Sequence, residues 1–303
     1  MAPSRLKVTV FLLLSLYIGG YVKEGAFLVL GGFLIFAIFF IVGMGLTYTR
    51  ALTKGRNSCF MSLVGRHRCM SFMSCLFSRP VSSSRTQRQA QAQISLVRND
   101  PIARAKNGYR ICLIGTSAFT YWEDVKTDLK PFNVFNAAFG GSRTSDLLPH
   151  TKPLVTEWTP SMICYYSGST DLLHNGGTPD CAFHGFQEFV KRVRITLPKC
   201  TIVYVCPLLA PIHFFRNTDQ KIDELIQLAS EWCTNEKYIY IINPNATIMN
   251  KDSEWTSSTK YYLNDGLHLT KEGHRMLGRA MLPIMTAAWN VSKDNGGDKG
   301  KVE

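Results

Sequence analysis

Apolar residues form two long runs near the N-terminus and short, spaced runs further along the chain. Residues 25–48 are 24 positions without a charge, and 8–22 form a second uncharged run of 15. As a helix, the longer run measures roughly 36 Å, more than the hydrocarbon core of a bilayer at about 30 Å. Because no small-residue cleavage pattern separates the runs, we predict a membrane anchor over 1–49. It contains one or two transmembrane helices, at about 6–22 and 25–48.

From residue 107 onward, short runs rich in β-branched residues alternate with longer segments of helical period. This alternation predicts an α/β domain over 107–290, in which right-handed crossovers build a parallel sheet covered by helices on both faces. A disordered tail is expected at 291–303. The predicted strands are 109–114, 133–137, 161–166, 201–206 and 238–242, and the predicted helices are 183–196, 218–234 and 271–288.

The formal net charge of +12 is concentrated in one segment. Residues 50–106 contain eleven basic residues and one acid, whereas 107–303 contain twenty of each. The neutral C-terminal part argues against a nucleic-acid-binding face. The polar composition predicts that 50–106 is a basic and largely disordered juxtamembrane linker. Since basic residues next to a span stay on the cytoplasmic side, the C-terminal domain is expected to face the cytosol, at a membrane that the charges do not specify.

The nine cysteines are an odd number and include no Cys-x-x-Cys pair. The sequence therefore suggests neither a disulfide framework nor a zinc ribbon. Cys59, Cys69 and Cys75 lie close to the predicted spans, where reversible acylation is chemically plausible.

Four polar, glycine-containing segments follow predicted strands or precede the last helix. In a parallel sheet, such loops meet at the carboxyl edge, where ligands bind. Each segment alone has an ordinary explanation as a helix cap or tight turn. Together they bring a nucleophile, backbone amides, a polar donor and a carboxylate–imidazole pair to one edge. The segments are Gly115-Thr116-Ser117, Gly140-Gly141-Ser142, Gly168-Ser169-Thr170-Asp171 and Asp265-Gly266-Leu267-His268.

In the order of these blocks, residues 110–282 resemble the SGNH hydrolases, also called GDSL-type esterases or lipases. The resemblance implies a flavodoxin-like α/β/α sandwich that hydrolyses esters through an acyl-enzyme, without a metal or organic cofactor. It makes Ser117 the nucleophile, His268 the general base and Asp265 the residue that orients His268. The amides of Ser117 and Gly141, together with Thr170, would form the oxyanion hole.

Two positions depart from the family pattern. Thr116 replaces an aspartate, and Thr170 replaces the asparagine that supplies the third oxyanion donor. Losing one such donor typically costs about 10² to 10³ in turnover. The main hypothesis is therefore a membrane-anchored serine esterase, lipase or lysophospholipase, and the alternative is a weak or inactive binding or scaffold protein with the same fold.

A second alternative is a lumenal glycan O-acetyl esterase or acyltransferase. It is motivated by the glycosylation triplets that begin at Asn245 and Asn290, and the charge distribution opposes it. For the main hypothesis, the anchor favours substrates that partition into membranes, such as lysophospholipids and other single-chain acyl esters. The oligomeric state is not indicated by the sequence.

Overall fold

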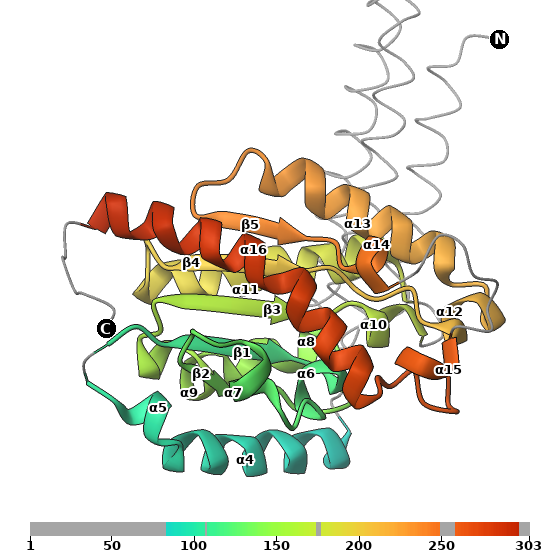
Figure 1. Cartoon of the computed structure of the whole chain (residues 1–303), viewed down its shortest axis with the longest axis horizontal. Coiled ribbons are helices and arrows are strands. Elements are labelled where there is room, and N and C mark those ends of the chain that lie inside the picture. The colour runs from blue at the N-terminus through green and yellow to red at the C-terminus, as the bar shows by residue number, and fades with distance from the viewer. Residues whose placement is uncertain (1–82, 107, 174–176, 249–257, 297–303) are drawn as a thin grey trace, which may run out of the picture. The chain divides into compact units, whose positions relative to one another are not determined.

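The computed structural model describes residues 83–106, 108–173, 177–248 and 258–296. Its centre is a five-stranded parallel sheet with strand order β2-β1-β3-β4-β5, as in flavodoxin-like folds (Figure 1). This confirms the predicted α/β fold class. Every residue of β1, β3 and β4 is buried, because helices cover both faces of the sheet. The strands are β1 (Ile111–Gly115), β2 (Val134–Asn136), β3 (Met162–Tyr166), β4 (Thr201–Val205) and β5 (Ile239–Ile242).

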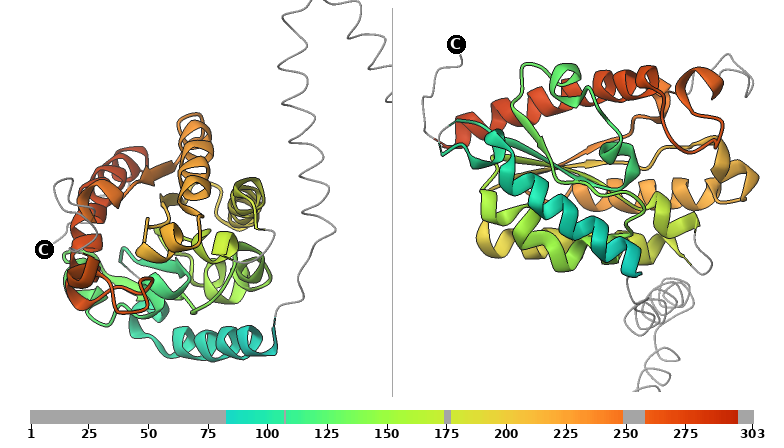
Figure 2. Two further views of the ribbon diagram at one scale, coloured as in Figure 1. Left: turned by 90° about the vertical axis from the view of Figure 1, so that its right-hand side faces the viewer. Right: turned by 90° about the horizontal axis from the view of Figure 1, so that it is seen from below.

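Successive strand residues point to opposite faces of the sheet and enter two separate cores. Cys112 and Ile114 pack toward one helical layer, whereas Ile111 and Leu113 pack toward the other. Figure 2 shows helices on both sides of the sheet. The first core includes residues of α4 (Ser84–Asn99), α5 (Pro101–Arg104), α8 (Thr144–Leu147), α9 (Thr151–Leu154), α11 (Pro179–Thr196) and α13 (Asp219–Cys233). The second includes residues of α6 (Ser117–Thr120), α7 (Val125–Asp128), α14 (Asn245–Ile248) and α16 (Lys271–Gly296).

The remaining helices are short. They are η2 (Leu148–His150), η3 (Thr156–Trp158), α10 (Ser169–Leu173), α12 (Pro211–Phe215) and α15 (Ser258–Tyr261). The three helices and five strands predicted from the sequence all exist, with ends that differ by a few residues except at the end of α16, which extends beyond the predicted 288 to Gly296.

The prediction of a largely disordered linker was wrong over residues 84–104, which form α4 and α5 and belong to the folded domain. Although α4 is rich in Ser, Gln and Arg, Ala90, Ile94 and Val97 lie on one side of the helix and are buried in the first core. At its start, Ser83 Oγ accepts a hydrogen bond from Thr86 N at 3.1 Å. Gln93 Nε2 donates to Asn136 O of β2 at 2.7 Å. Burial and these bonds hold α4 beside the edge of the sheet (Figure 1).

The predicted disordered tail was also wrong at its start, because α16 continues to Gly296. Its last residue in the core is Trp289, and the helix then extends to Gly296, a residue type that is common where helices end. The predicted spans, the linker up to residue 82, the three juxtamembrane cysteines and residues 297–303 lie outside the described residues. Within the described ranges, no helix is both long and apolar enough to cross a membrane.

Candidate active site

The turn after β1 places Ser117 at the carboxyl edge of the sheet, as the first residue of α6. A side chain at Gly115 would put Cβ only 2.0 Å from the carbonyl oxygen of Tyr166 on β3, so this close approach requires glycine. Thr116 N donates to the same oxygen at 3.2 Å. Phe119 of α6 is buried in the second core. The turn is thus fixed on both sides of Ser117.

The glycine loop after β2 is bonded directly to the end of β1. Phe139 N and the buried Ser142 hydroxyl both donate to Gly115 O, at 3.1 and 3.2 Å. Between them, Gly141 has φ 71°, a left-handed conformation that favours glycine. The predicted oxyanion amide of Gly141 therefore lies on a loop that is attached to the strand preceding Ser117.

Thr170 lies in α10, at the carboxyl end of β3. Its Oγ1 is 3.2 Å from Oγ1 of Thr116, which is buried. The neighbouring Asp171 accepts hydrogen bonds from Thr144 N, at 3.1 Å to its nearer oxygen, and from Thr144 Oγ1 at 2.7 Å. Burial raises the pKa of Asp171 to about 6, although the two bonds from Thr144 act against the rise. The third loop is thus bonded to both preceding loops.

Asp265 and His268 form a carboxylate–imidazole pair. Asp265 Oδ2 lies 2.5 Å from His268 Nδ1, and Oδ1 accepts the backbone N–H groups of Leu267 and His268, each at 2.9 Å. Burial acts to raise the pKa of Asp265, but the bonds from His268 and Leu267 outweigh it, so the pKa is lowered. The ring of Tyr121 packs edge-on against His268, with ring centres 5.1 Å apart.

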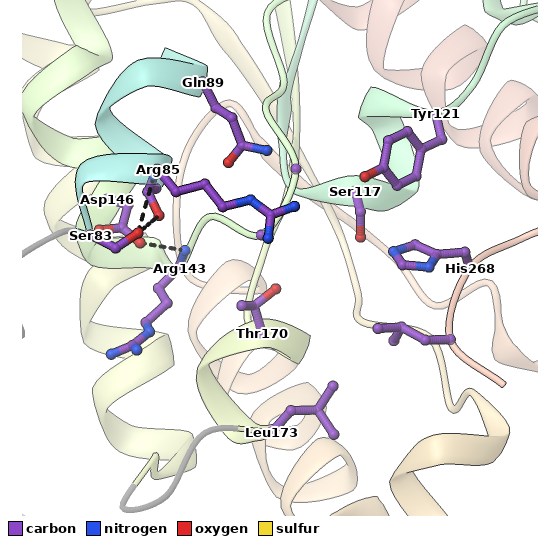
Figure 3. A pocket seen from close by; sticks show the side chains of 14 residues that line it. Ser83, Arg85, Gln89, Ser117, Tyr121, Arg143, Asp146, Thr170, Leu173 and His268 are labelled. Carbon is purple, nitrogen blue, oxygen red and sulfur yellow. Dashed lines mark hydrogen bonds between the residues drawn. The ribbon is translucent and has the colours of Figure 1, made fainter. Parts of the chain in front are cut away.

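These loops surround a pocket of about 530 Å³, shown in Figure 3. Four of the five predicted site residues line it, namely Ser117, Gly141, Thr170 and His268, and Asp265 lies behind His268. Among the described residues, the hydrogen bond of the His268 ring is the one from Nδ1 to Asp265, and none joins His268 to the side chain of Ser117. Across the described ranges, no group of three or more His, Cys, Asp or Glu is arranged to hold a metal ion.

The sequence model of the GDSL-like Lipase/Acylhydrolase family matches residues 86–276. The chain belongs to the GDSL-like lipase/acylhydrolase family. Membership of this family makes the protein a hydrolase of ester bonds. The matched region begins within α4, which agrees with the finding that α4 belongs to the folded domain. No curated protein matches this sequence.

Solved structures of low sequence identity share the fold of this GDSL-like protein. A Bacteroides fragilis protein described as an acylhydrolase has 18% identity and a TM-score of 0.54, over 70% of this chain and 100% of its own. A GDSL-like lipase from Bacteroides thetaiotaomicron has 17% identity and a TM-score of 0.51, over 68% and 98%. A lipase/acylhydrolase from Enterococcus faecalis has 17% identity and a TM-score of 0.50, over 59% and 96%. At these identities the likeness concerns the fold.

Sequence reasoning missed several residues that line the pocket of this GDSL-like hydrolase. Arg85 and Gln89 come from α4, and Tyr121 follows α6. The α4 residues lie in a stretch whose composition indicated disorder. The spacing of Ala90, Ile94 and Val97 was the one available sign of a buried helix.

Proposed function

We propose that this chain is a serine hydrolase in which Ser117, His268 and Asp265 act as a catalytic triad. The observation that carries the proposal is the Asp265–His268 pair, since His268 also lines the pocket that contains Ser117. With Nδ1 bonded to Asp265, the imidazole keeps its proton on Nδ1 and leaves Nε2 free to act as a base.

In the first half-reaction, Ser117 Oγ attacks the acyl carbonyl while His268 Nε2 takes the hydroxyl proton. The negative charge of the tetrahedral intermediate falls on the former carbonyl oxygen, where the amides of Ser117 and Gly141 and the hydroxyl of Thr170 donate to it. His268 then protonates the departing alcohol, which leaves an ester on Ser117. Water, activated by His268, hydrolyses this ester and regenerates the free serine.

The proposed substrates are single-chain acyl esters, including lysophospholipids, at the cytosolic face of a membrane. Support comes from the uncharged segment 25–48 and from the basic residues that follow it. An anchored hydrolase encounters membrane-bound substrate at a high effective concentration.

The alternative of a lumenal glycan esterase was motivated by two glycosylation triplets, and the first of them begins at a buried asparagine. Asn245 is 7% exposed, its Oδ1 accepts from Leu209 N at 2.8 Å, and its Nδ2 donates to Pro207 O at 3.1 Å. A glycan on this amide would break both bonds, so the residue has a structural role in the folded domain. Asn290 on α16 is exposed and is the remaining acceptor of the two.

The decisive experiment replaces the nucleophile. The purified protein should release p-nitrophenol from short-chain p-nitrophenyl esters and react with a fluorophosphonate probe. Ser117→Ala should abolish both, with a loss of at least about 10³ in turnover. The control is Ser95→Ala, which removes an exposed hydroxyl of α4 that bonds only within its own helix. Probe labelling that persists in Ser117→Ala would refute the assignment.

A further inference from the structure

Helix α4 supplies one wall of the pocket that contains Ser117. Ser83, Arg85, Thr86 and Gln89 line it from the first two turns of the helix. Figure 3 shows α4 on one side of Ser117 and His268 on the other. Because Ala90 and Ile94 are buried and Gln93 is bonded to β2, this wall is fixed to the rest of the domain. A substrate bound at Ser117 would therefore have α4 as a neighbour.

The α4 wall presents a positive charge to the pocket. Figure 3 shows the guanidinium group of Arg85 extending from α4 toward Ser117 and Thr170. Among the residues that the structure describes, the guanidinium group of Arg85 has no hydrogen-bond or ion-pair partner. The guanidinium of Arg143 points away from Ser117 in the same view. The lining carboxylate of Asp146 is 8% exposed and accepts Arg143 N at 3.0 Å. Asp146 thus bonds to the backbone and not to Arg85, and the guanidinium group that extends toward Ser117 is that of Arg85.

A second cavity of about 420 Å³ shares Tyr121 and His268 with the first and has the opposite charge. Three carboxylates line it, those of Glu123, Asp124 and Asp128, together with Lys271. Lys271 pairs with Glu123 at 3.3 Å and lies 3.8 Å from Asp124, so its charge is already balanced. An anionic group would be repelled from this cavity and attracted to the first.

We propose that Arg85 forms a subsite for an anionic group of the ester, a phosphate or a carboxylate, beside Ser117. The proposal rests on the assignment of Ser117 as the nucleophile. A guanidinium group suits this role, because its planar N–H groups bind phosphate or carboxylate oxygens in pairs and it remains charged at neutral pH. Arg85 would then select substrates by binding and take no part in bond making or breaking.

The test uses the full-length protein in detergent micelles and two matched pairs of esters. Mono-p-nitrophenyl succinate and p-nitrophenyl butyrate differ by a carboxylate on the acyl side. Lysophosphatidate and monoacylglycerol with the same acyl chain differ by a phosphate on the alcohol side. The measured quantity is the ratio of kcat/KM for the anionic ester to that for its neutral partner. We expect Arg85→Gln to lower this ratio about tenfold in at least one pair, through KM.

Two further variants separate a specific subsite from a general effect of charge. Arg88→Gln removes another exposed arginine of α4, which is outside the set of residues lining the pocket, and should leave the ratio unchanged. Arg85→Lys should keep part of the preference, because it keeps the charge but loses the paired N–H groups. The pair that responds identifies the side of the ester bond on which the anion lies.

The outcomes also separate this proposal from the proposed function. Hydrolysis of the neutral esters with no preference for the anionic ones in either pair would overturn the Arg85 subsite alone. An equal fall of the ratio in Arg85→Gln and Arg88→Gln would do the same, since it would show a diffuse charge effect. No hydrolysis of any ester by the unmodified protein would instead refute the proposed function.

Discussion

At the scale of single residues, the two departures from the family pattern contact each other. Thr116 and Thr170 are separated by 54 positions in the sequence, yet their hydroxyl oxygens are 3.2 Å apart. Each hydroxyl has one proton to donate. If the buried Thr116 donates to Thr170, the proton of Thr170 is free to point at the oxyanion. We therefore expect Thr170 to be the third oxyanion donor and Thr116 to be a positioning residue that acts through it.

Thr170→Val removes this donor at nearly constant volume and should lower kcat by about 10², with a smaller change in KM. Thr116→Val should lower kcat less, by about tenfold, whereas Thr116→Ser, which keeps the hydroxyl, should restore most of it. Steady-state kinetics of the two single variants and the double variant test the coupling. If Thr116 acts through Thr170, the double variant is no slower than Thr170→Val alone. Additive losses in the double variant would show that Thr116 does not act through Thr170.

At the scale of secondary-structure elements, Asp171 joins the helices that carry the glycine loop and the third loop. Its carboxylate on α10 holds the first turn of α8 through two groups of Thr144. Burial disfavours the charged form, and the folded-state pKa of about 6 lies above the ordinary value of 3.8. Protonated Asp171 is therefore favoured by folding. Its contribution to stability is fully present below pH 3.8 and is lost as pH rises through 6.

Asp171→Asn makes this position neutral at every pH and should remove that part of the pH dependence. Between pH 4 and 7, the free energy of unfolding of the unmodified protein should fall relative to the variant by about 2 kcal/mol. Urea unfolding of residues 83–303 at several pH values measures the difference. Glu224→Gln, which neutralises an exposed acid of α13, is the control. A difference that does not vary with pH would show that the Asp171 pKa is not raised in the fold.

The elements differ in how well the sequence predicts them. Strands such as β3 (Met162–Tyr166) are continuous apolar runs, which suit a sheet buried on both faces, so local sequence is enough to predict them. The blocks that contain Ser117 and His268 could be placed at one edge because parallel strands end together. Helix α4 was missed because its buried stripe is narrow and its other positions are polar. The Thr116–Thr170 contact and the position of Arg85 depend on tertiary packing between distant segments, which local patterns do not contain.

At the scale of the whole molecule, the folded domain begins before residue 107, and its stability should depend on α4 and α5. A chain of residues 107–303 loses the burial of Ile94, Val97, Ala90 and Ala103 and exposes the core beneath them. Compared with 83–303, we expect the free energy of unfolding to fall by about 3 to 6 kcal/mol, estimated from the buried side chains. Urea denaturation measures this, with Ile94→Ala in 83–303 as an intermediate case. Equal stability of the two chains would mean that α4 is not part of the cooperative fold.

The N-terminal segments should determine how membrane-bound substrate reaches Ser117. Segment 25–48 is uncharged and is followed by basic residues, so the full-length chain should remain on anionic vesicles that contain lysophospholipid. Residues 83–303 contain the pocket but must find the vesicle by diffusion. We expect the full-length protein to hydrolyse the lysophospholipid at least about tenfold faster at equal enzyme concentration, because anchoring raises the effective substrate concentration. A water-soluble p-nitrophenyl ester serves as the control, and the two proteins should hydrolyse it at similar rates. Equal rates on the lysophospholipid would show that the N-terminal segments do not direct the choice of substrate.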